Sequence, residues 1–220
     1  EDQYIWKIFR ASSLSTKFRS EVKNSMGVAQ KNKGIRGWSN TLANGGVATV
    51  MAIMSYYTGQ DIYLIGFLGA LSTATADTLA TEIGQGMQGK PRLLTEPKKT
   101  IDVGTSGGIT IVGELAGLLG ALIIGLSAVV LSIINISSFV LIEIVLLSGF
   151  LGSNLDSFLG ASIQSSNACR VCGKHTEHLI HHGKKTKRIK GIWIIENNLV
   201  NLISTFSGAL IAILLFIQFS

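Results

Sequence analysis

The sequence predicts an all-α membrane protein, a polytopic helix bundle with about five transmembrane helices and a basic N-terminal segment. Its mean hydropathy is +0.42, and its charged residues are concentrated in a few segments. Five runs with almost no charge reach the ~20 residues that span a bilayer. A soluble protein does not accommodate five such helices, so we expect the lipid bilayer to surround the chain. The runs are 42–60, 62–82, 108–133, 138–160 and 197–219.

The segment before the first run differs from the rest of the chain. Residues 1–35 contain no span and no signal-peptide pattern, and eight basic residues precede the first run. Its early part, YIWKIFRASSLSTKF, is expected to form an interfacial amphipathic helix or part of a helix. Residues 36–220 are expected to form one membrane-embedded catalytic bundle, with a Cys- and His-rich cytoplasmic loop over 165–192.

The later runs differ in how closely their composition matches that of a transmembrane helix. The third and fourth each contain one acid, Glu114 and Glu143, which is costly in hydrocarbon unless it faces other helices. The fifth, LVNLISTFSGALIAILLFIQF, is the clearest span.

The basic residues predict the orientation. All 19 Lys and Arg lie before the first run, between the second and third, or between the fourth and fifth. The positive-inside rule therefore puts the N-terminus in the cytoplasm and the C-terminus outside. Trp38 and Trp193 are expected at the cytoplasmic boundary, and Tyr56, Tyr57 and Tyr63 at the opposite one. The net charge of +6 then reflects topology and anionic lipid headgroups, and no nucleic-acid partner is expected.

Polar motifs gather at the cytoplasmic ends of all five runs. They are RGWSNTLANGG (36–46), ADTLATEIG (76–84), DVGTSGGIT (102–110), GSNLDSFLGASIQ (152–164) and ENNLVNLIS (196–204). Transporters place their binding residues near the membrane midplane on broken helices. The pattern therefore favours a site at the cytoplasmic surface, with transport as the less supported alternative.

Three acids in these motifs are the expected catalytic and metal-binding residues. Asp77, Glu82 and Asp156 are hard oxygen ligands suited to Mg²⁺ that bridges phosphate oxygens. Asp77 and Glu82 are five residues apart, too far round an ideal helix to share an ion without a break or a bridging water, so Asp77 pairs better with Asp156. Alternatively, these acids cap helix ends or pair with Lys90 and Arg92.

The expected phosphate- and nucleotide-binding residues are a glycine-rich loop, two basic side chains and four asparagines. Glycines allow close approach to a ligand, and the helix N-terminus that follows offers N–H groups, although the loop is not a Walker A sequence. Asparagines spaced i,i+4 share a helix face, either as a pocket wall or as caps and interhelical links. The set is Asn40, Asn44, Lys90, Arg92, Gly104, Thr105, Ser106, Gly107, Gly108, Asn197 and Asn201.

The loop NACRVCGKHTEHLIHHG (167–183) contains both cysteines and all four histidines. Cys-x₂-Cys followed by His predicts a structural Zn²⁺ site, with a metal-free loop as the alternative. A catalytic Cys–His pair is less supported, and a disulfide is not expected in a cytoplasmic loop. The candidate ligands are Cys169, Cys172 and two of His175, His178, His181 and His182, with His178 and His181 as the expected pair.

Taken in order, RGWSNTLANGG, ADTLATEIG, KPRLLT, VGTSGGIT, GFLGSNLDSFLGA and GIWIIENNLVN resemble the transmembrane protein 19 family, over about residues 36–204. Its characterised plant and cyanobacterial members are phytyl-phosphate kinases. The resemblance implies transfer of a phosphoryl group from CTP to an isoprenoid monophosphate, phytyl or geranylgeranyl, giving the diphosphate. A CTP-dependent cytidylyltransferase that releases pyrophosphate would use the same layout and is the alternative.

Overall fold

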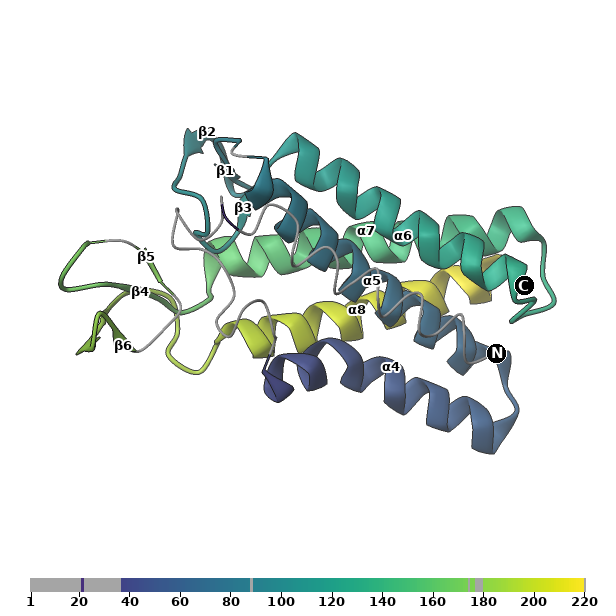
Figure 1. The fold of residues 1–220 in the computed structure, drawn as a ribbon. Helices are drawn as coiled ribbons and strands as arrows, with labels where there is room; N and C mark the ends of the chain where they lie inside the picture. The colour runs from purple at the N-terminus through teal and green to yellow at the C-terminus, as the bar shows by residue number, and fades with distance from the viewer. Residues whose placement is uncertain (1–20, 22–36, 88, 174, 177–179, 220) are drawn as a thin grey trace.

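The computed structural model describes residues 21, 37–87, 89–173, 175–176 and 180–219. Within these residues, five helices form an up-and-down bundle (Figure 1). The basic segment predicted over 1–35 therefore lies outside the described residues, except for Glu21. The helices are α4 (Trp38–Thr58), α5 (Asp61–Gly86), α6 (Ile111–Val130), α7 (Ser138–Ser162) and α8 (Asn197–Phe219).

Short strands occupy two connections, and both lie at the same end of the bundle, here called the strand-bearing end (Figure 1). Between α5 and α6, three antiparallel strands pair in the order β2-β1-β3. They are β1 (Arg92–Leu93), β2 (Glu96–Thr100) and β3 (Gly108–Ile109).

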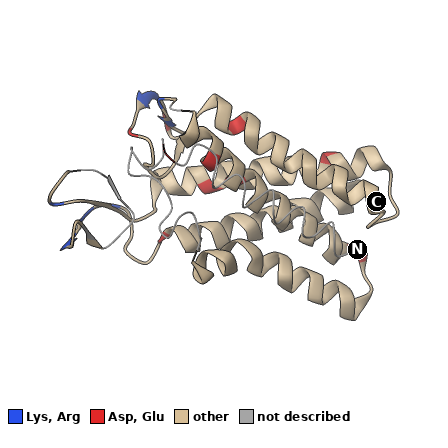
Figure 2. Ribbon diagram, viewed as in Figure 1, with Lys and Arg blue, Asp and Glu red and all other residues tan. Residues whose placement is uncertain are grey.

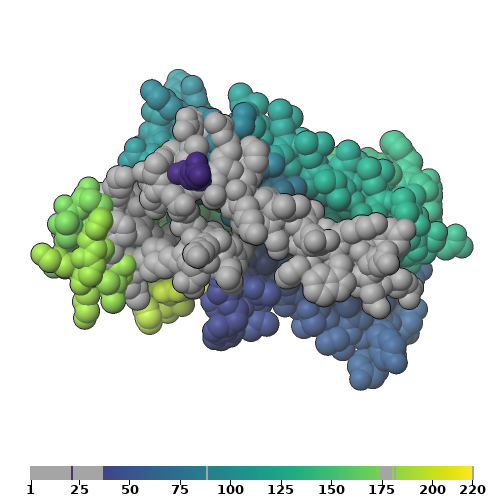
Figure 3. Space-filling view, viewed as in Figure 1, coloured from purple at the N-terminus to yellow at the C-terminus, as the bar shows by residue number. Residues whose placement is uncertain are grey.

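The second set of strands joins α7 to α8 and projects from the bundle (Figure 3). One sheet has the order β5-β4-β8, and a separate hairpin pairs β6 with β7. They are β4 (Ser166–Ala168), β5 (His175–Thr176), β6 (Ile180–His181), β7 (Lys184–Lys185) and β8 (Lys187–Lys190).

Helix α5 is the centre of the bundle and packs against all four other helices. Ser72 Oγ donates to the Val145 carbonyl at 2.8 Å, and Thr73 Oγ1 donates to the Ser148 carbonyl at 3.2 Å. A Cβ added to Gly152 of α7 would come within 2.3 Å of Thr73 Oγ1. Small residues and interhelical hydroxyl bonds are typical of helix packing in membranes, where close backbone approach replaces the hydrophobic effect.

The outward face of α6 is an apolar stripe. Its large exposed side chains recur every three or four residues, which places them on one side of the helix. A stripe of this length suits contact with lipid, while the small residues of α6 face the other helices. The exposed residues are Ile111, Leu115, Leu119, Ile123, Leu126 and Val130.

The two ends of the bundle have different interiors. The apolar core includes Ile65, Ile124, Leu141 and Ile144, all fully or nearly fully buried toward the end opposite the strands. Toward the strand-bearing end, many of the buried side chains are polar, and they include Thr78, Glu82, Ser153, Asp156, Gln164, Asn201 and Ser204.

The predicted all-α fold is confirmed. Four helices, α5 to α8, are long and apolar enough to cross a membrane, and α4 is long enough but is not among these four. Glu114 of α6 faces another helix, because it accepts a hydrogen bond from Asn154 Nδ2 of α7 at 3.1 Å.

The boundaries of the runs were less accurate than their number. The fifth run coincides with α8, whereas α4 begins before 42 and α5 continues past 82, to Gly86. The third run was wrong at its start because Gly108–Ile109 pairs with β1. Helix α6 begins after Thr110, whose Oγ1 caps it by accepting from the Gly113 N–H at 3.0 Å.

Candidate functional site

A chain of hydrogen bonds connects three helices at the strand-bearing end. Ser204 Oγ donates to Asp156 Oδ2 at 2.9 Å. The Asn201 amide, in the orientation that satisfies both of its ends, donates to the same oxygen at 3.1 Å and accepts from Asn44 Nδ2 at 2.9 Å. Asn44 Nδ2 also donates to the Asn40 carbonyl at 2.9 Å. Three of the predicted asparagines thus lie in one network with Asp156.

The network lies inside the bundle. Asp156 is 9% exposed and Asn201 is 4% exposed. Burying a carboxylate is costly unless hydrogen bonds replace its water, and here two side chains of α8 donate to it. Asn197, the fourth predicted asparagine, contributes its main-chain carbonyl, which accepts from Asn201 at 3.2 Å.

The register of α5 against α7 places Asp77 at the same depth in the bundle as Asp156. Thr73 of α5 packs against Gly152 of α7. Both helices run toward the strand-bearing end, and one turn further along each lie Asp77 and Asp156. This is the pairing that the spacing of the acids favours.

Glu82 lies on another side of α5. The helix is unbroken from Asp61 to Gly86, so residues five apart, Asp77 and Glu82, point about 140° apart. Within the described ranges, one group of three His, Cys, Asp or Glu residues has its ligand atoms within 4.8 Å, and it contains no acid. The three predicted acids therefore do not form one preassembled carboxylate cluster.

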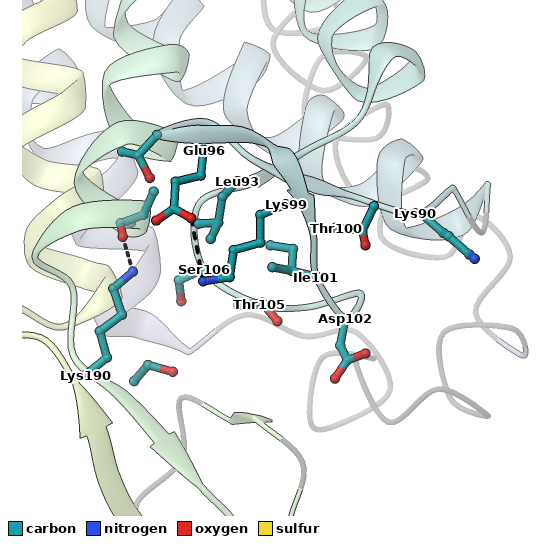
Figure 4. A pocket seen from close by; sticks show the side chains of 14 residues that line it. Lys90, Leu93, Glu96, Lys99, Thr100, Ile101, Asp102, Thr105, Ser106 and Lys190 are labelled. Carbon is teal, nitrogen blue, oxygen red and sulfur yellow. Dashed lines mark hydrogen bonds and ion pairs between the residues drawn. The ribbon is translucent and has the colours of Figure 1, made fainter.

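A pocket of about 640 Å³ opens at the strand-bearing end (Figure 4). Its walls come from β1 and β2, the loop before β3, the last turns of α7 and the end of β8. Gly160 of α7 lines the pocket and lies one turn beyond Asp156, so the pocket adjoins the network. The charged lining residues are Lys90, Glu96, Lys99, Asp102 and Lys190.

The glycine-rich loop lines the pocket through its hydroxyls and packs on α7 through a glycine. Thr105 and Ser106 are lining residues. Gly107 has a φ of +79°, and a Cβ there would lie 2.1 Å from the Ala161 amide nitrogen. This close approach sets the loop against the end of α7.

The remaining predicted phosphate-binding residues are placed differently. Lys90 lines the pocket, whereas Arg92 is exposed and absent from its wall. Arg92 Nη1 donates to the Pro97 carbonyl at 2.8 Å, which closes the β1–β2 turn. Gly108 belongs to β3, and Gly104, with a φ of +86°, is likewise absent from the pocket wall.

Two pocket lysines were missed by sequence reasoning, which assigned them only to membrane topology. Lys190 extends from β8 toward Lys99 and Glu96 (Figure 4), and its Nζ donates to the Ala161 carbonyl. Burial lowers the pKa of Lys190, Lys99 lowers it further, and Glu96 opposes both. Lys99 Nζ lies 3.8 Å from Glu96 Oε2. No sequence signal separates these lysines from their neighbours, because their placement depends on strand pairing.

Comparison with known proteins identifies the family. Residues 5–209 match the model of the integral membrane protein DUF92 family. The chain belongs to this family. It is 31% identical to Protein PGR of Arabidopsis thaliana over 218 residues, which cover 89% of this chain and 74% of that protein.

Other relatives of this DUF92 chain are similarly distant. It is 34% identical to an uncharacterized membrane protein of Methanocaldococcus jannaschii, over 82% of this chain and 63% of the relative. It is 26% identical to the chloroplastic Protein VTE6 of Arabidopsis thaliana, over 94% of this chain and 56% of that protein. No solved structure matches.

Charge is segregated in this DUF92 chain. None of the five described helices contains Lys or Arg, and the described basic residues lie at the strand-bearing end (Figure 2). Trp38 and Trp193 are exposed beside this end, while Tyr56 and Tyr57 are exposed at the other end of α4. This is the distribution that the sequence predicts.

The loop between α7 and α8 contains the second candidate site. Cys169, Cys172 and His182 bring their ligand atoms within 4.8 Å of one another. Of the expected histidine pair, His178 and the side chain of His181 lie outside what the structure describes.

Proposed function

We propose that the protein is a CTP-dependent kinase that phosphorylates an isoprenoid monophosphate, of the phytyl or geranylgeranyl type, to the diphosphate. The observation that carries the proposal is the position of a lysine-lined pocket next to the buried, hydrogen-bonded Asp156 at one end of a membrane bundle. The motif resemblance to the transmembrane protein 19 family supports this reaction class. Similarity to Protein VTE6 over 94% of the chain agrees with it.

The proposal includes an orientation. The strand-bearing end faces the cytoplasm, where CTP is available and where the positive-inside rule puts Lys and Arg. The apolar outer faces of the helices contact lipid, so an isoprenoid tail reaches the site from the membrane while its phosphate stays at the helix ends.

The nucleotide phosphates bind in the pocket. Its volume of about 640 Å³ falls within the range of about 300–1,000 Å³ that small-molecule sites occupy. Lys90, Lys99 and Lys190 supply positive charge for phosphate oxygens. The Thr105 and Ser106 hydroxyls, which also line the pocket, add hydrogen-bond donors.

Mg²⁺ fits the carboxylate pair. It is usually bound by one or two carboxylates together with substrate phosphates and water, so a cluster of three acids is not needed. Asp77 and Asp156 would hold it, and Glu82, on another side of α5, supports the site from outside that pair. When bound, the ion neutralises charge on the transferring phosphoryl group.

The residues of the chain position the reactants. Ser204 and Asn201 fix the orientation of Asp156, and the pocket lysines hold the leaving nucleotide. An oxygen of the isoprenoid monophosphate bonds to the γ-phosphorus of CTP as the bond to the β-phosphate oxygen breaks, which releases CDP. The attacking oxygen is already ionised, so no strong general base is required.

Product analysis tests this proposal. Purified protein with Mg²⁺, CTP and phytyl or geranylgeranyl monophosphate should yield the prenyl diphosphate and CDP. Asp77→Asn and Asp156→Asn should each lower kcat by at least about 10²-fold, the scale of lost transition-state stabilisation. Asp61→Asn, in the first turn of α5 at the other end of the bundle, is the matched control.

Two outcomes would overturn the assignment. Release of pyrophosphate with a cytidylylated lipid would make the protein a cytidylyltransferase. Folded protein that forms no product with any isoprenoid monophosphate would exclude both reactions.

A second pair of variants tests the nucleotide site. Lys99 lines the pocket and Lys98, its neighbour on β2, does not. Lys99→Ala should raise the KM for CTP severalfold, while Lys98→Ala, which removes the same charge, should leave it unchanged. Equal effects would show that only the overall basic field attracts CTP.

A further inference from the structure

The loop between α7 and α8 carries a cluster of metal-ligating groups that the proposed reaction does not use. The sulfurs of Cys169 and Cys172 and a ring nitrogen of His182 lie within 4.8 Å of one another. With Zn–S near 2.3 Å and Zn–N near 2.0–2.1 Å, two ligands of one tetrahedral zinc ion are about 3.5–4 Å apart. The three groups are therefore nearly at coordinating distances.

The turn that carries the cysteines directs a backbone amide at one of the two sulfurs. The Val171 N–H donates to Cys169 Sγ at 3.3 Å. The Gly173 N–H donates to the Cys169 carbonyl at 3.0 Å, which closes the turn around both cysteines. A hydrogen bond to sulfur stabilises its charged form, and the thiolate is the form that binds metal.

The histidine comes from a separate hairpin, in an unusual backbone conformation. His181 pairs with Lys184, which leaves His182-Gly183 as a two-residue turn. Their φ values are +50° and +70°, as a type I′ turn requires at both positions. Such values are uncommon for residues other than glycine, and strained residues of this kind cluster at functional sites.

We propose that Cys169, Cys172 and His182 bind one structural zinc ion, with a fourth ligand completing the tetrahedron. Thiolate and imidazole together are the donor set that zinc favours in structural sites. Two independent features of the fold bring the ligands together: the Val171 N–H that donates to Cys169 Sγ and the left-handed backbone conformation of His182.

The ion would join the two pieces of this loop. Cys169 directly follows β4, which pairs with β8, and β8 ends in Lys190 of the pocket. His182 belongs to the β6–β7 hairpin, which makes no strand pairing with that sheet among the residues that the structure describes. Zinc would fix the hairpin against the sheet, and binding free energy of this kind contributes directly to folding.

Metal analysis tests the zinc site without reference to catalysis, so its outcome is independent of the kinase proposal. Full-length protein, purified in detergent without a polyhistidine tag, should contain about one zinc ion per chain. Cys172→Ser should lower this content at least fivefold. His182→Asn should also lower it, and asparagine tolerates the left-handed conformation, so the hairpin is kept. Lys185→Ala, in the same hairpin, should retain the zinc.

Cobalt substitution keeps the test decisive if a variant folds poorly. Wild-type protein loaded with Co²⁺ should show thiolate-to-cobalt charge-transfer absorption, and Lys185→Ala should show the same bands. The proposal is overturned by three results: folded wild type that takes up no zinc or cobalt, Cys172→Ser protein with undiminished zinc, or a Cys169–Cys172 disulfide in protein purified without oxidant.

Discussion

Replacing Gly107 with alanine should push the glycine-rich loop away from α7. Its φ of +79° costs an L-residue about 1–2 kcal/mol. The added Cβ would lie 2.1 Å from the Ala161 nitrogen, whereas ordinary contact begins at 3.4 Å. The two backbones must therefore separate by the difference, about 1.3 Å, and overpacking of this kind costs about 1–3 kcal/mol.

Gly59→Ala provides the matched control. Gly59 has a φ of +66° and nothing within 4 Å of an added Cβ, at the opposite end of the bundle. It should show the conformational cost alone, about 1–2 kcal/mol. Gly107→Ala should reach about 2–5 kcal/mol once the overpacking is included.

Enzyme activity should distinguish Gly107→Ala from Gly59→Ala more clearly than stability does. A displacement of about 1 Å at a positioning element lowers turnover by about 10²-fold, and Thr105 and Ser106 move with Gly107. The assay is thermal unfolding in detergent, combined with the KM for CTP and kcat on the isoprenoid monophosphate. Equal losses of stability in the two variants, or an unchanged KM and kcat in Gly107→Ala, would refute the reasoning.

Three further predictions concern the network and the pocket. Asn201→Ala removes a donor to Asp156 and should lower the free energy of unfolding by about 1–3 kcal/mol. The control, Ser162→Ala, removes an exposed hydroxyl that donates to carbonyls within α7 and should change the free energy of unfolding by less than about 0.5 kcal/mol. Both variants are compared by chemical unfolding, and similar losses of stability would contradict the network. Because the pKa of Lys190 is lowered below its ordinary 10.5, its charge is present at low pH and is lost before that of an ordinary lysine. CTP affinity should therefore fall as pH rises through that window and stay flat in Lys190→Gln, and identical pH profiles would exclude the role. Lys99→Ala removes the neighbouring positive charge, so the remaining fall should move to higher pH, as titration of CTP binding would show.

The bundle was predictable because each helix is a long, mostly apolar run without Lys or Arg. The start of α6 was not, since β3 depends on pairing Ile109 with Arg92 across 17 residues of chain. Local composition favours a helix through Gly108–Ile109, and the strand pairing overrides it. The same sheet uses Arg92, which sequence reasoning assigned to phosphate, to close its β1–β2 turn, and the sequence pattern does not reveal this contact.

The part of the candidate site that could be predicted is the part in which residues meet because they lie at the same depth in the bundle. Asn44, Asn201 and Asp156 come from three helices, and their matching distances from the helix ends were enough to bring them together. Lys190 needed the register of β4 against β8, which no pattern in the sequence reveals. His182 needed the conformation of a two-residue turn, so the expected histidine pair did not include it.

The central position of α5 also bears on how the chain enters a membrane. Of the four candidate spans, α5 has the lowest hydropathy, 1.3 against 1.8 to 2.2 for α6, α7 and α8, and the largest buried share, 50%. Its Ser72 and Thr73 contact α7 and α8, which are made after it. A nascent chain that has reached α5 therefore holds a helix that favours the bilayer weakly, and insertion is completed when α8 emerges. Chains truncated before α8 would leave polar groups of α5 facing lipid. The membrane insertion and degradation machinery would then encounter an incompletely packed bundle.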